Sequence, residues 1–194
     1  MEIRFANKND NKLRIAELLY ETDRYIYPYW FKTKQEGIKV LSSLLDEHDS
    51  LFSLNNFIVA TMNNQIVGIL HFFNGSQNLT FNYSQLANTN FNYNHVVKNY
   101  ILPLEEKVNK NSAYVFGLRV ADAYTRQHIG ESLMNSFLKT LKPNTTAMLD
   151  VLADNKPALA LYLKTGFQID STYKGYNGYR MHKPICHSMS QIKN

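Results

Sequence analysis

The stretch of sequence that decides the fold is LDVLADNKPALALYLKTGF, residues 149–167. Its first three residues, a polar one between two apolar ones, close a strand-like run. Asn155 stands where a helix N-cap belongs, and Pro157 lies in the first helical turn, which needs no backbone donor. Gly166 follows the last turn, as glycine commonly does. The stretch therefore predicts a strand and a helix, with Phe167 opening the next strand.

The sequence just before this stretch repeats the same order of elements. Residues 114–120 form an apolar run typical of a strand, and helical spacing predicts a helix from about residue 128 to 141. A strand over 147–151 and a helix over about 156–164 follow. This alternation implies a right-handed crossover and two neighbouring parallel strands.

The remaining elements come from the N-terminal half and the C-terminal end. They are a strand over 2–6, a helix from Leu13 that Pro28 stops, a helix from about Thr33 to Leu45, and paired strands over 56–62 and 65–73 and over 167–173 and 178–182. The sequence thus predicts a mixed α/β fold. Its central sheet has about six to seven mostly antiparallel strands, with a parallel pair in the middle and flanking helices.

We expect one domain over residues 1–183, because 194 residues suffice for one core and show no internal repeat. Residues 74–112 interrupt the rhythm. Polar and aromatic residues without a period precede a helical spacing around Pro103, which predicts an inserted loop and helix. Residues 184–194 are predicted to be a C-terminal tail.

Composition narrows the class of protein. Hydrophobic residues make up 44% and charged residues 19%, which is typical of a globular chain. The one cysteine, Cys186, cannot form an intramolecular disulfide, and there is neither a signal-like apolar start nor a stretch long enough to span a membrane. We therefore expect a cytoplasmic protein with no membrane partner.

Several binding classes are disfavoured by the sequence. The net charge of +5 is spread along the chain without a Lys/Arg cluster, so nucleic acid is not expected as a partner. Residues 46–49, Asp-Glu-His-Asp, are adjacent on a helix end and share no face, so no metal site is expected there. Glycine-rich phosphate loops and the Gly-x-Ser-x-Gly nucleophile motif do not occur.

One combination of residues goes beyond helix capping. The chain resembles the GNAT family of acetyl-CoA-dependent N-acetyltransferases, whose signature is matched by Leu149-Asp150-Val151, Asn155, Ala158, Leu161-Tyr162 and Gly166-Phe167. The resemblance implies the acyl-CoA N-acyltransferase fold. In that fold the strand over 114–120 carries a bulge, which Gly117 suits, and splays from the strand over 147–152 to leave a cleft for the pantetheine arm.

The resemblance also implies how acetyl-CoA, the acyl donor, is bound without a metal. Backbone N–H groups of Leu118, Arg119 and Val120 would face the acetyl oxygen and the pantetheine, and Asn155 would hydrogen-bond the pantetheine arm. The start of the following helix would face the pyrophosphate. The residues implied there are Arg126, Gln127, His128, Ile129, Gly130, Glu131 and Ser132.

The pyrophosphate loop departs from the family pattern of Arg or Gln, two residues, Gly, one residue, then Gly or Ala. Aligning Ile129-Gly130 places Thr125 at the basic position and His128 at the first Gly. Placing Arg126 at the basic position instead shortens the loop by one residue. In both alignments a Cβ stands where backbone normally approaches phosphate, which predicts lower affinity or a reshaped loop. His128 or Arg126 would compensate by donating to phosphate.

The resemblance implies direct attack of a neutral amine on the thioester. Tyr162 matches the general acid that protonates the sulfur; the alternative is a tyrosine that only packs. Asp150 matches a Glu that acts as the base in ribosomal-protein N-terminal acetyltransferases; the alternative is a carboxylate paired with Arg119 or solvent.

Acceptor recognition is implied for the first two helices and their loop. Aromatic and acidic residues gather there and would enclose a cationic amine: Glu21, Asp23, Tyr25, Tyr27, Tyr29 and Trp30. The alternative is that the aromatic side chains pack in the core. The insert over 74–112 would cover the acceptor cleft or form the face of a homodimer.

The leading prediction is thus an N-acetyltransferase acting on a primary amine of a small molecule or a peptide. The alternative is a GNAT-fold protein that has lost catalysis and serves in binding or regulation. Thr125 and His128 favour the alternative, whereas Asn155 and Tyr162 favour the enzyme.

Overall fold

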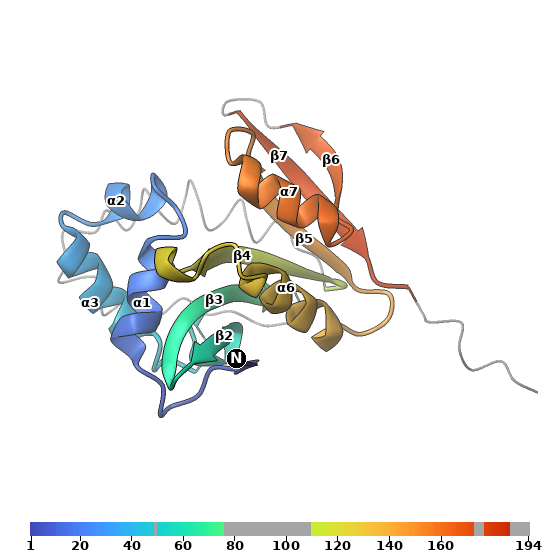
Figure 1. The fold of residues 1–194 in the computed structure, drawn as a ribbon. Helices are drawn as coiled ribbons and strands as arrows, with labels where there is room; N and C mark the ends of the chain where they lie inside the picture. Colours follow the sequence, from blue (N-terminus) through green and yellow to red (C-terminus); the bar gives the residue numbers. More distant parts are fainter. Residues whose placement is uncertain (49, 76–109, 173–176, 187–194) are drawn as a thin grey trace, which may run out of the picture.

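Seven strands form one sheet in the order β1-β2-β3-β4-β5-β7-β6 (Figure 1). The computed structural model describes residues 1–48, 50–75, 110–172 and 177–186. The strands are β1 (Glu2–Phe5), β2 (Phe57–Met62), β3 (Gln65–Asn74), β4 (Ser112–Val120), β5 (Thr146–Leu152), β6 (Gln168–Thr172) and β7 (Gly178–Pro184). Neighbouring strands are antiparallel except β4 and β5, which are parallel. The predicted fold class is confirmed.

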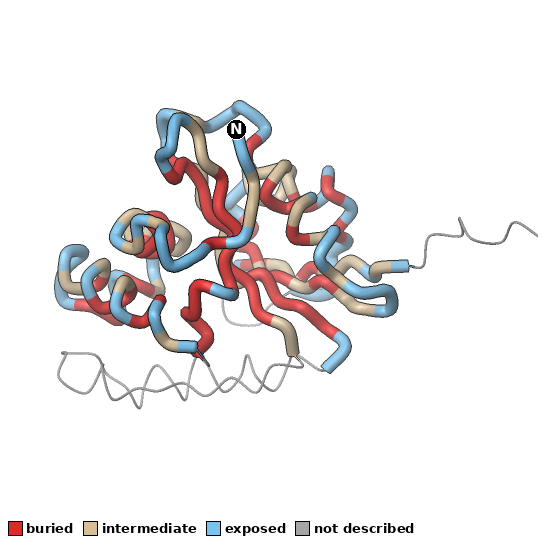
Figure 2. The backbone as a smooth tube through the Cα atoms, turned by 90° about the horizontal axis from the view of Figure 1, so that it is seen from below, coloured by how far each residue is buried: buried red, intermediate tan, exposed pale blue. Residues whose placement is uncertain are grey.

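Helices cover both faces of this sheet. The helices are α1 (Lys12–Tyr20), α2 (Ile26–Trp30), α3 (Lys34–Leu44), α6 (Ile129–Thr140) and α7 (Lys156–Lys164), with short 3₁₀ turns η1 (Leu54–Asn56) and η4 (Asp122–Tyr124). Helices α1 to α3 share one hydrophobic core with the sheet, and α6 and α7 share the other. Figure 2 shows the central strands buried between these layers and the outer helix turns exposed.

Local signals in the sequence explain where several elements begin. The side chains of Asn11, Thr33 and Asn155 each accept a hydrogen bond from a backbone N–H in the first turn of α1, α3 and α7. Asn63 and Asn64, with φ of 50° and 61°, make the left-handed turn that joins β2 to β3. These helices and the hairpin begin close to the predicted residues.

The region around Pro28 differs from the prediction. Pro28 does not stop a long first helix, because α1 already ends at Tyr20 and Pro28 lies inside the short helix α2. The Asp23 carboxylate accepts hydrogen bonds from the N–H groups of Tyr25 and Ile26 at 2.7 and 2.8 Å and so starts α2. Proline is tolerated in the first turn because its missing N–H would have no partner there.

The parallel pair opens part-way along its length. β4 and β5 pair only from Ser112 and Thr146 to Val115 and Leu149. Beyond this point β4 continues beside β3, and β5 continues beside β7. A shift in the pairing of β3 with β4 leaves Phe116 as an extra residue, which is a β-bulge. The predicted bulge and splay are therefore present.

Two predicted segments lie largely outside the described residues. They are the insert, of which 76–109 are not described, and the tail, of which 187–194 are not described. The division into one domain, an insert and a tail stays a prediction. No helix of the described residues is long and apolar enough to cross a membrane.

His71 is a buried histidine in the core beneath α1 to α3. Its Nε2 donates to the Leu51 carbonyl at 2.8 Å, and its ring stacks on Phe57 with 4.3 Å between centroids. Nδ1 is buried and has no hydrogen-bond partner among the described residues. Burial lowers the pKa of His71 to about 4, so the ring is neutral in the folded protein at pH 7.

The lowered pKa of His71 predicts acid sensitivity. Between pH 6.5 and 4 the unfolded chain binds a proton at His71 that the folded protein does not, so stability falls as pH falls. The loss attributable to His71 is about 3 kcal/mol over this window. Urea unfolding of His71→Gln should show a shallower pH dependence than the wild type. The exposed control His48→Gln should keep the wild-type dependence; identical slopes for both variants would contradict the assignment.

Candidate active site

The opening between β4 and β5 presents backbone donors. The Ala121 N–H donates to the Val67 carbonyl of the β2–β3 hairpin at 2.8 Å. Because donors alternate along a strand, the N–H groups of Leu118 and Val120 point the other way, toward the gap beside β5. The end of β4 therefore offers two N–H groups where the sheet is open, whereas the N–H of Arg119, which was predicted to join them, points toward β3.

The loop that leads into α6 is shaped for an anion. Arg126 and His128 both adopt left-handed backbone conformations, with φ of 61° and 59°. His128 is the N-cap of α6, and its side chain makes no capping hydrogen bond. Within the described residues the N–H groups of the first turn are therefore available to phosphate oxygens, with the exposed Arg126 beside them. This donor set fits the pyrophosphate of coenzyme A.

The side chains of His128, Glu131 and Lys164 join the start of α6 to the end of α7. The Glu131 carboxylate lies 2.7 Å from Lys164 Nζ and 3.1 Å from His128 Nδ1. Lys164, and then His128, hold the pKa of Glu131 below its usual range. Glu131, which was predicted to face the pyrophosphate, is thus an anion paired with two cationic or donor groups rather than a free negative charge in the phosphate loop.

The left-handed conformation of His128 gives a prediction. A non-glycine residue in this conformation costs about 1 kcal/mol, which glycine avoids. His128→Gly should therefore be more stable by about 1 kcal/mol than Gln127→Gly, a neighbouring exposed position whose φ is not positive. Urea unfolding of the two variants measures the difference. Equal destabilisation would mean that residue 128 does not hold the left-handed conformation in solution.

Helix α7 supplies Asn155 and Tyr162. Asn155 Oδ1 accepts from the Ala158 N–H at 3.3 Å, and within the described residues its Nδ2 makes no hydrogen bond. Tyr162 is 8% exposed and lies 6.1 Å from Phe167 between ring centroids. Burial raises the pKa of Tyr162 to about 12, so its hydroxyl carries a proton at neutral pH. Both the packing role and the predicted acid role fit this placement.

Asp150 is bound by an arginine that the sequence did not single out. Arg180 Nε and Nη2 donate to the two carboxylate oxygens of Asp150, each at 2.9 Å, and the two residues are opposite each other in β5 and β7. The side chain of Asp150 is 18% exposed and that of Arg180 is 12% exposed. The predicted alternative partner, Arg119, is instead engaged elsewhere.

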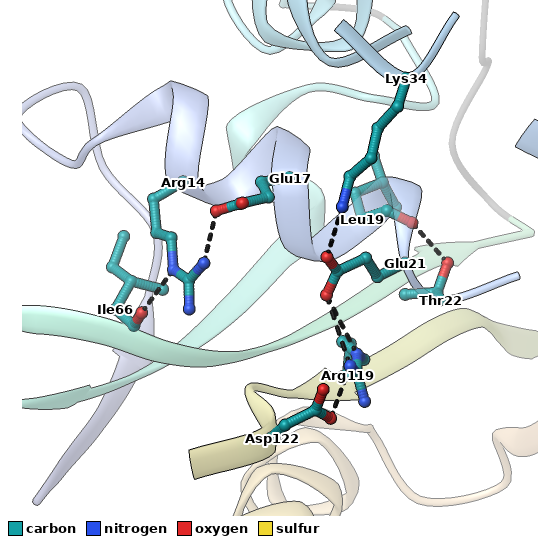
Figure 3. A network of polar contacts seen from close by, with 9 residues as sticks. All are labelled: Arg14, Glu17, Leu19, Glu21, Thr22, Lys34, Ile66, Arg119 and Asp122. Carbon is teal, nitrogen blue, oxygen red and sulfur yellow. Dashed lines mark hydrogen bonds and ion pairs between the residues drawn. The ribbon is translucent and has the colours of Figure 1, made fainter. Parts of the chain in front are cut away.

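Arg119 belongs to a polar network around the end of α1 (Figure 3). It donates to Asp122 at 2.8 Å and to Glu21 at 3.4 Å, and Lys34 binds the other Glu21 oxygen at 2.8 Å. Burial alone would raise the pKa of Glu21, but Lys34 and Arg119 outweigh it and lower that pKa. Glu21 is therefore an anion already neutralised by two cations.

The aromatic residues predicted to enclose an acceptor divide into two groups. Tyr27 and Trp30 are 0% and 3% exposed and pack edge to face, 5.4 Å apart. Burial, with a contribution from Asp23, raises the pKa of Tyr27 well above its usual value. These two residues belong to the core, as the packing alternative holds, because they anchor the short helix α2. Tyr25 is 59% exposed, so it remains available for binding.

The loop between α1 and α2 lies directly over the bulge. A Cβ at Gly117 would stand 2.9 Å from Thr22 Cβ, closer than side chains tolerate. Glycine is therefore required at residue 117 by the close approach of Thr22, in addition to any bulge geometry. This contact and the Arg119–Glu21 ion pair place Glu21 and Thr22 beside the end of β4.

Comparison with known proteins now decides the family. The family model described as "Acetyltransferase (GNAT) family" matches residues 16–167. The chain belongs to the GNAT family. No curated protein sequence matches it.

Solved structures share the GNAT fold with this chain. An N-acetyltransferase from Staphylococcus aureus Mu50 is 19% identical, with a TM-score of 0.69 over 94% of this chain and 98% of that one. The ribosomal-protein-S18-alanine N-acetyltransferase from Escherichia coli is 15% identical, with a TM-score of 0.56 over 100% and 99%. The PaiA N-acetyltransferase from Thermoplasma acidophilum, solved in complex with coenzyme A, is 18% identical, with a TM-score of 0.55 over 94% and 98%.

In this GNAT protein the structure brings most predicted donor-site residues to one opening in the sheet, and it adds residues that sequence reasoning missed. The missed residues are Thr22, which lies against Gly117, and Arg180, which binds Asp150. Each is recognised only through a contact with a distant segment, so spacing along the chain carried no signal for it. In the part of the chain that the structure describes, no cluster of His, Cys, Asp or Glu is placed to hold a metal ion.

Proposed function

We propose that this GNAT protein transfers an acetyl group from acetyl-CoA to a primary amine of a small molecule or a peptide. The observation that carries the proposal is the opening between β4 and β5. It combines inward-facing N–H groups on β4, an anion-binding start of α6 and a protonated tyrosine on α7. Acetyl-CoA supplies the activated thioester.

The residues of β4 and α6 hold the donor in this proposal. The first-turn N–H groups of α6 and Arg126 bind the pyrophosphate, and Asn155 Nδ2 hydrogen-bonds the pantetheine arm. The N–H groups of Leu118 and Val120 bind the pantetheine and stabilise negative charge on the acetyl oxygen during attack. Positioning and charge stabilisation of this kind need no covalent intermediate on the protein.

Two side chains handle protons in this proposal. The Tyr162 hydroxyl donates its proton to the sulfur as the thiolate leaves. Asp150 accepts the proton of the attacking amine through a water molecule, with Arg180 fixing its carboxylate. Asp150 and Met148 alternate with the buried residues that face α6, so Asp150 lies on the sheet face covered by α1 to α3. Donor and acceptor thus approach from different sides of the opening.

Release of free thiol tests the proposal. The protein is mixed with acetyl-CoA and a panel of primary amines, and coenzyme A thiol is followed with a chromogenic disulfide. The Cys186→Ser variant is used because Cys186 is exposed and would itself react with the reagent. Amine-dependent thiol release, with acetylated amine detected by mass spectrometry, is expected. Tight acetyl-CoA binding without release for any amine would favour a binding protein over an enzyme.

A further inference from the structure

An ion pair connects two loops that are far apart in the sequence. Arg24, between α1 and α2, donates from Nη2 to Oδ2 of Asp154, between β5 and α7. The side chains of Arg24 and Asp154 remain 59% and 58% exposed. The Arg24 guanidinium also lies over the ring of Tyr25, 4.8 Å from its centroid. A single cation is therefore held between a carboxylate and an aromatic face.

The position of this pair relates it to the opening in the sheet. Thr22 rests on Gly117 at the bulge, so the loop that carries Arg24 lies over the end of β4. Asp154 follows β5 and directly precedes Asn155, the N-cap of α7. Arg24 therefore connects the loop beside the end of β4 to the loop that follows β5, at the same opening to which the donor is assigned above.

The carboxylates around the opening differ in how easily the cation bound to each can be replaced by another cation. Glu21 and Arg119 are tied into the network with Lys34 and Asp122, and Asp150 is bound by Arg180. Asp154 differs because its partner among the described residues, Arg24, is an exposed side chain. Exposed ion pairs contribute only about 0–1 kcal/mol, so another cation in solution can replace the guanidinium at small cost.

We propose that Asp154 and the Tyr25 ring form a binding site for the primary alkylammonium group of the acceptor, and that Arg24 occupies this site until the acceptor displaces it. This proposal rests on the proposed acetyl transfer, because the site would bind the acceptor of that reaction. The carboxylate attracts the ammonium, and the ring adds a cation–π contact. The acceptor is accordingly a flexible alkylammonium rather than a neutral or anionic amine.

Competition between Arg24 and the ligand predicts that removing the positive charge of Arg24 improves the binding of a positively charged alkylammonium. The probe is n-butylammonium chloride, titrated at low salt while the Tyr25 ring and the Asp154 amide are followed by nuclear magnetic resonance. Arg24→Ala should bind it about two- to fivefold more tightly than the wild type. Asp154→Asn should weaken binding at least about threefold, and the double variant should bind as weakly as Asp154→Asn.

Matched controls separate this site from general charge effects. Lys139→Ala removes an exposed cation at the far end of α6 and should leave binding unchanged. n-Butanol should not shift the same signals. The proposal is overturned if Arg24→Ala weakens binding, or if Lys139→Ala strengthens it equally.

Acetyl-CoA titrations of the same variants separate the two proposals. Normal acetyl-CoA binding and thiol release with an unresponsive Tyr25–Asp154 site would reject the acceptor site alone. Absence of acetyl-CoA binding would reject the proposed acetyl transfer, whether or not n-butylammonium binds at Tyr25 and Asp154.

Discussion

Tyr162→Phe is expected to lower kcat about 10²-fold while the dissociation constant for acetyl-CoA changes less than about twofold. The hydroxyl is the only group removed, and it makes no hydrogen bond to the described residues, so packing of the ring is retained. Without the hydroxyl the sulfur must leave as a free thiolate or take its proton from water. Steady-state kinetics with the best acceptor of the amine panel, alongside calorimetry with acetyl-CoA, measures both quantities.

A matched variant isolates the acid role from the loss of a buried hydroxyl. Tyr20 is similarly buried, at 9% exposure against 8%, but it packs under α1 to α3 with Tyr27. Tyr20→Phe should leave kcat unchanged. Because the pKa of Tyr162 is about 12, wild-type activity should also show no loss of this proton up to about pH 10. Unchanged turnover in Tyr162→Phe would remove the residue from the acid role.

Arg180→Met is expected to destabilise the fold by about 2–4 kcal/mol. The variant removes the bidentate donor of the partly buried Asp150 carboxylate, and the loss of two charge-assisted hydrogen bonds in such a place is costly. Asp150→Asn/Arg180→Met should be less destabilised than the sum of the two single variants, because the charge is then absent. Urea unfolding of the four proteins gives this coupling energy.

The surface pair of Lys12 and Asp46 provides the comparison. Their side chains are 29% and 60% exposed, so Lys12→Met should cost less than about 1 kcal/mol. If Arg180→Met costs no more than Lys12→Met, the Asp150 pair contributes little and the fixed orientation proposed for Asp150 has no support.

The catalytic part of the Asp150 proposal needs a different readout. If Asp150 accepts the amine proton, Asp150→Asn should lower kcat and flatten the rise of the rate with pH. The unfolding experiments show separately whether the variant is folded. A folded Asp150→Asn variant with an unaltered pH profile would reject Asp150 as the base and leave it as half of a structural ion pair.

Local chemistry made much of the fold predictable. Asn155, Pro157 and Gly166 mark the ends of α7 because capping depends on residues within a few positions of one another. Asn63-Asn64 identifies its hairpin for the same reason. The prediction that Pro28 ends the first helix was wrong because proline also fits the first turn of a helix. The hydrogen bonds that Asp23 accepts from Tyr25 and Ile26 start a new helix there.

The site was predictable only where it follows the chain locally. The start of α6 and the end of β4 came from element order and the family signature. Arg180 beside Asp150, and Arg24 beside Asp154, depend on strand register and loop placement between segments far apart in sequence. Tyr27 and Trp30 carry the composition of an aromatic binding site, yet their burial is a property of how α2 packs.

Titration of the purified protein with acetyl-CoA by calorimetry tests the central claim most directly. If the opening between β4 and β5 and the α6 loop form the donor site, binding is saturable. Acetyl-CoA at about 100 times its dissociation constant then raises the free energy of unfolding by about 2.7 kcal/mol, seen as a thermal shift. Absence of both heat and thermal shift at millimolar acetyl-CoA would contradict the account, because the loop at His128 would then not bind the donor.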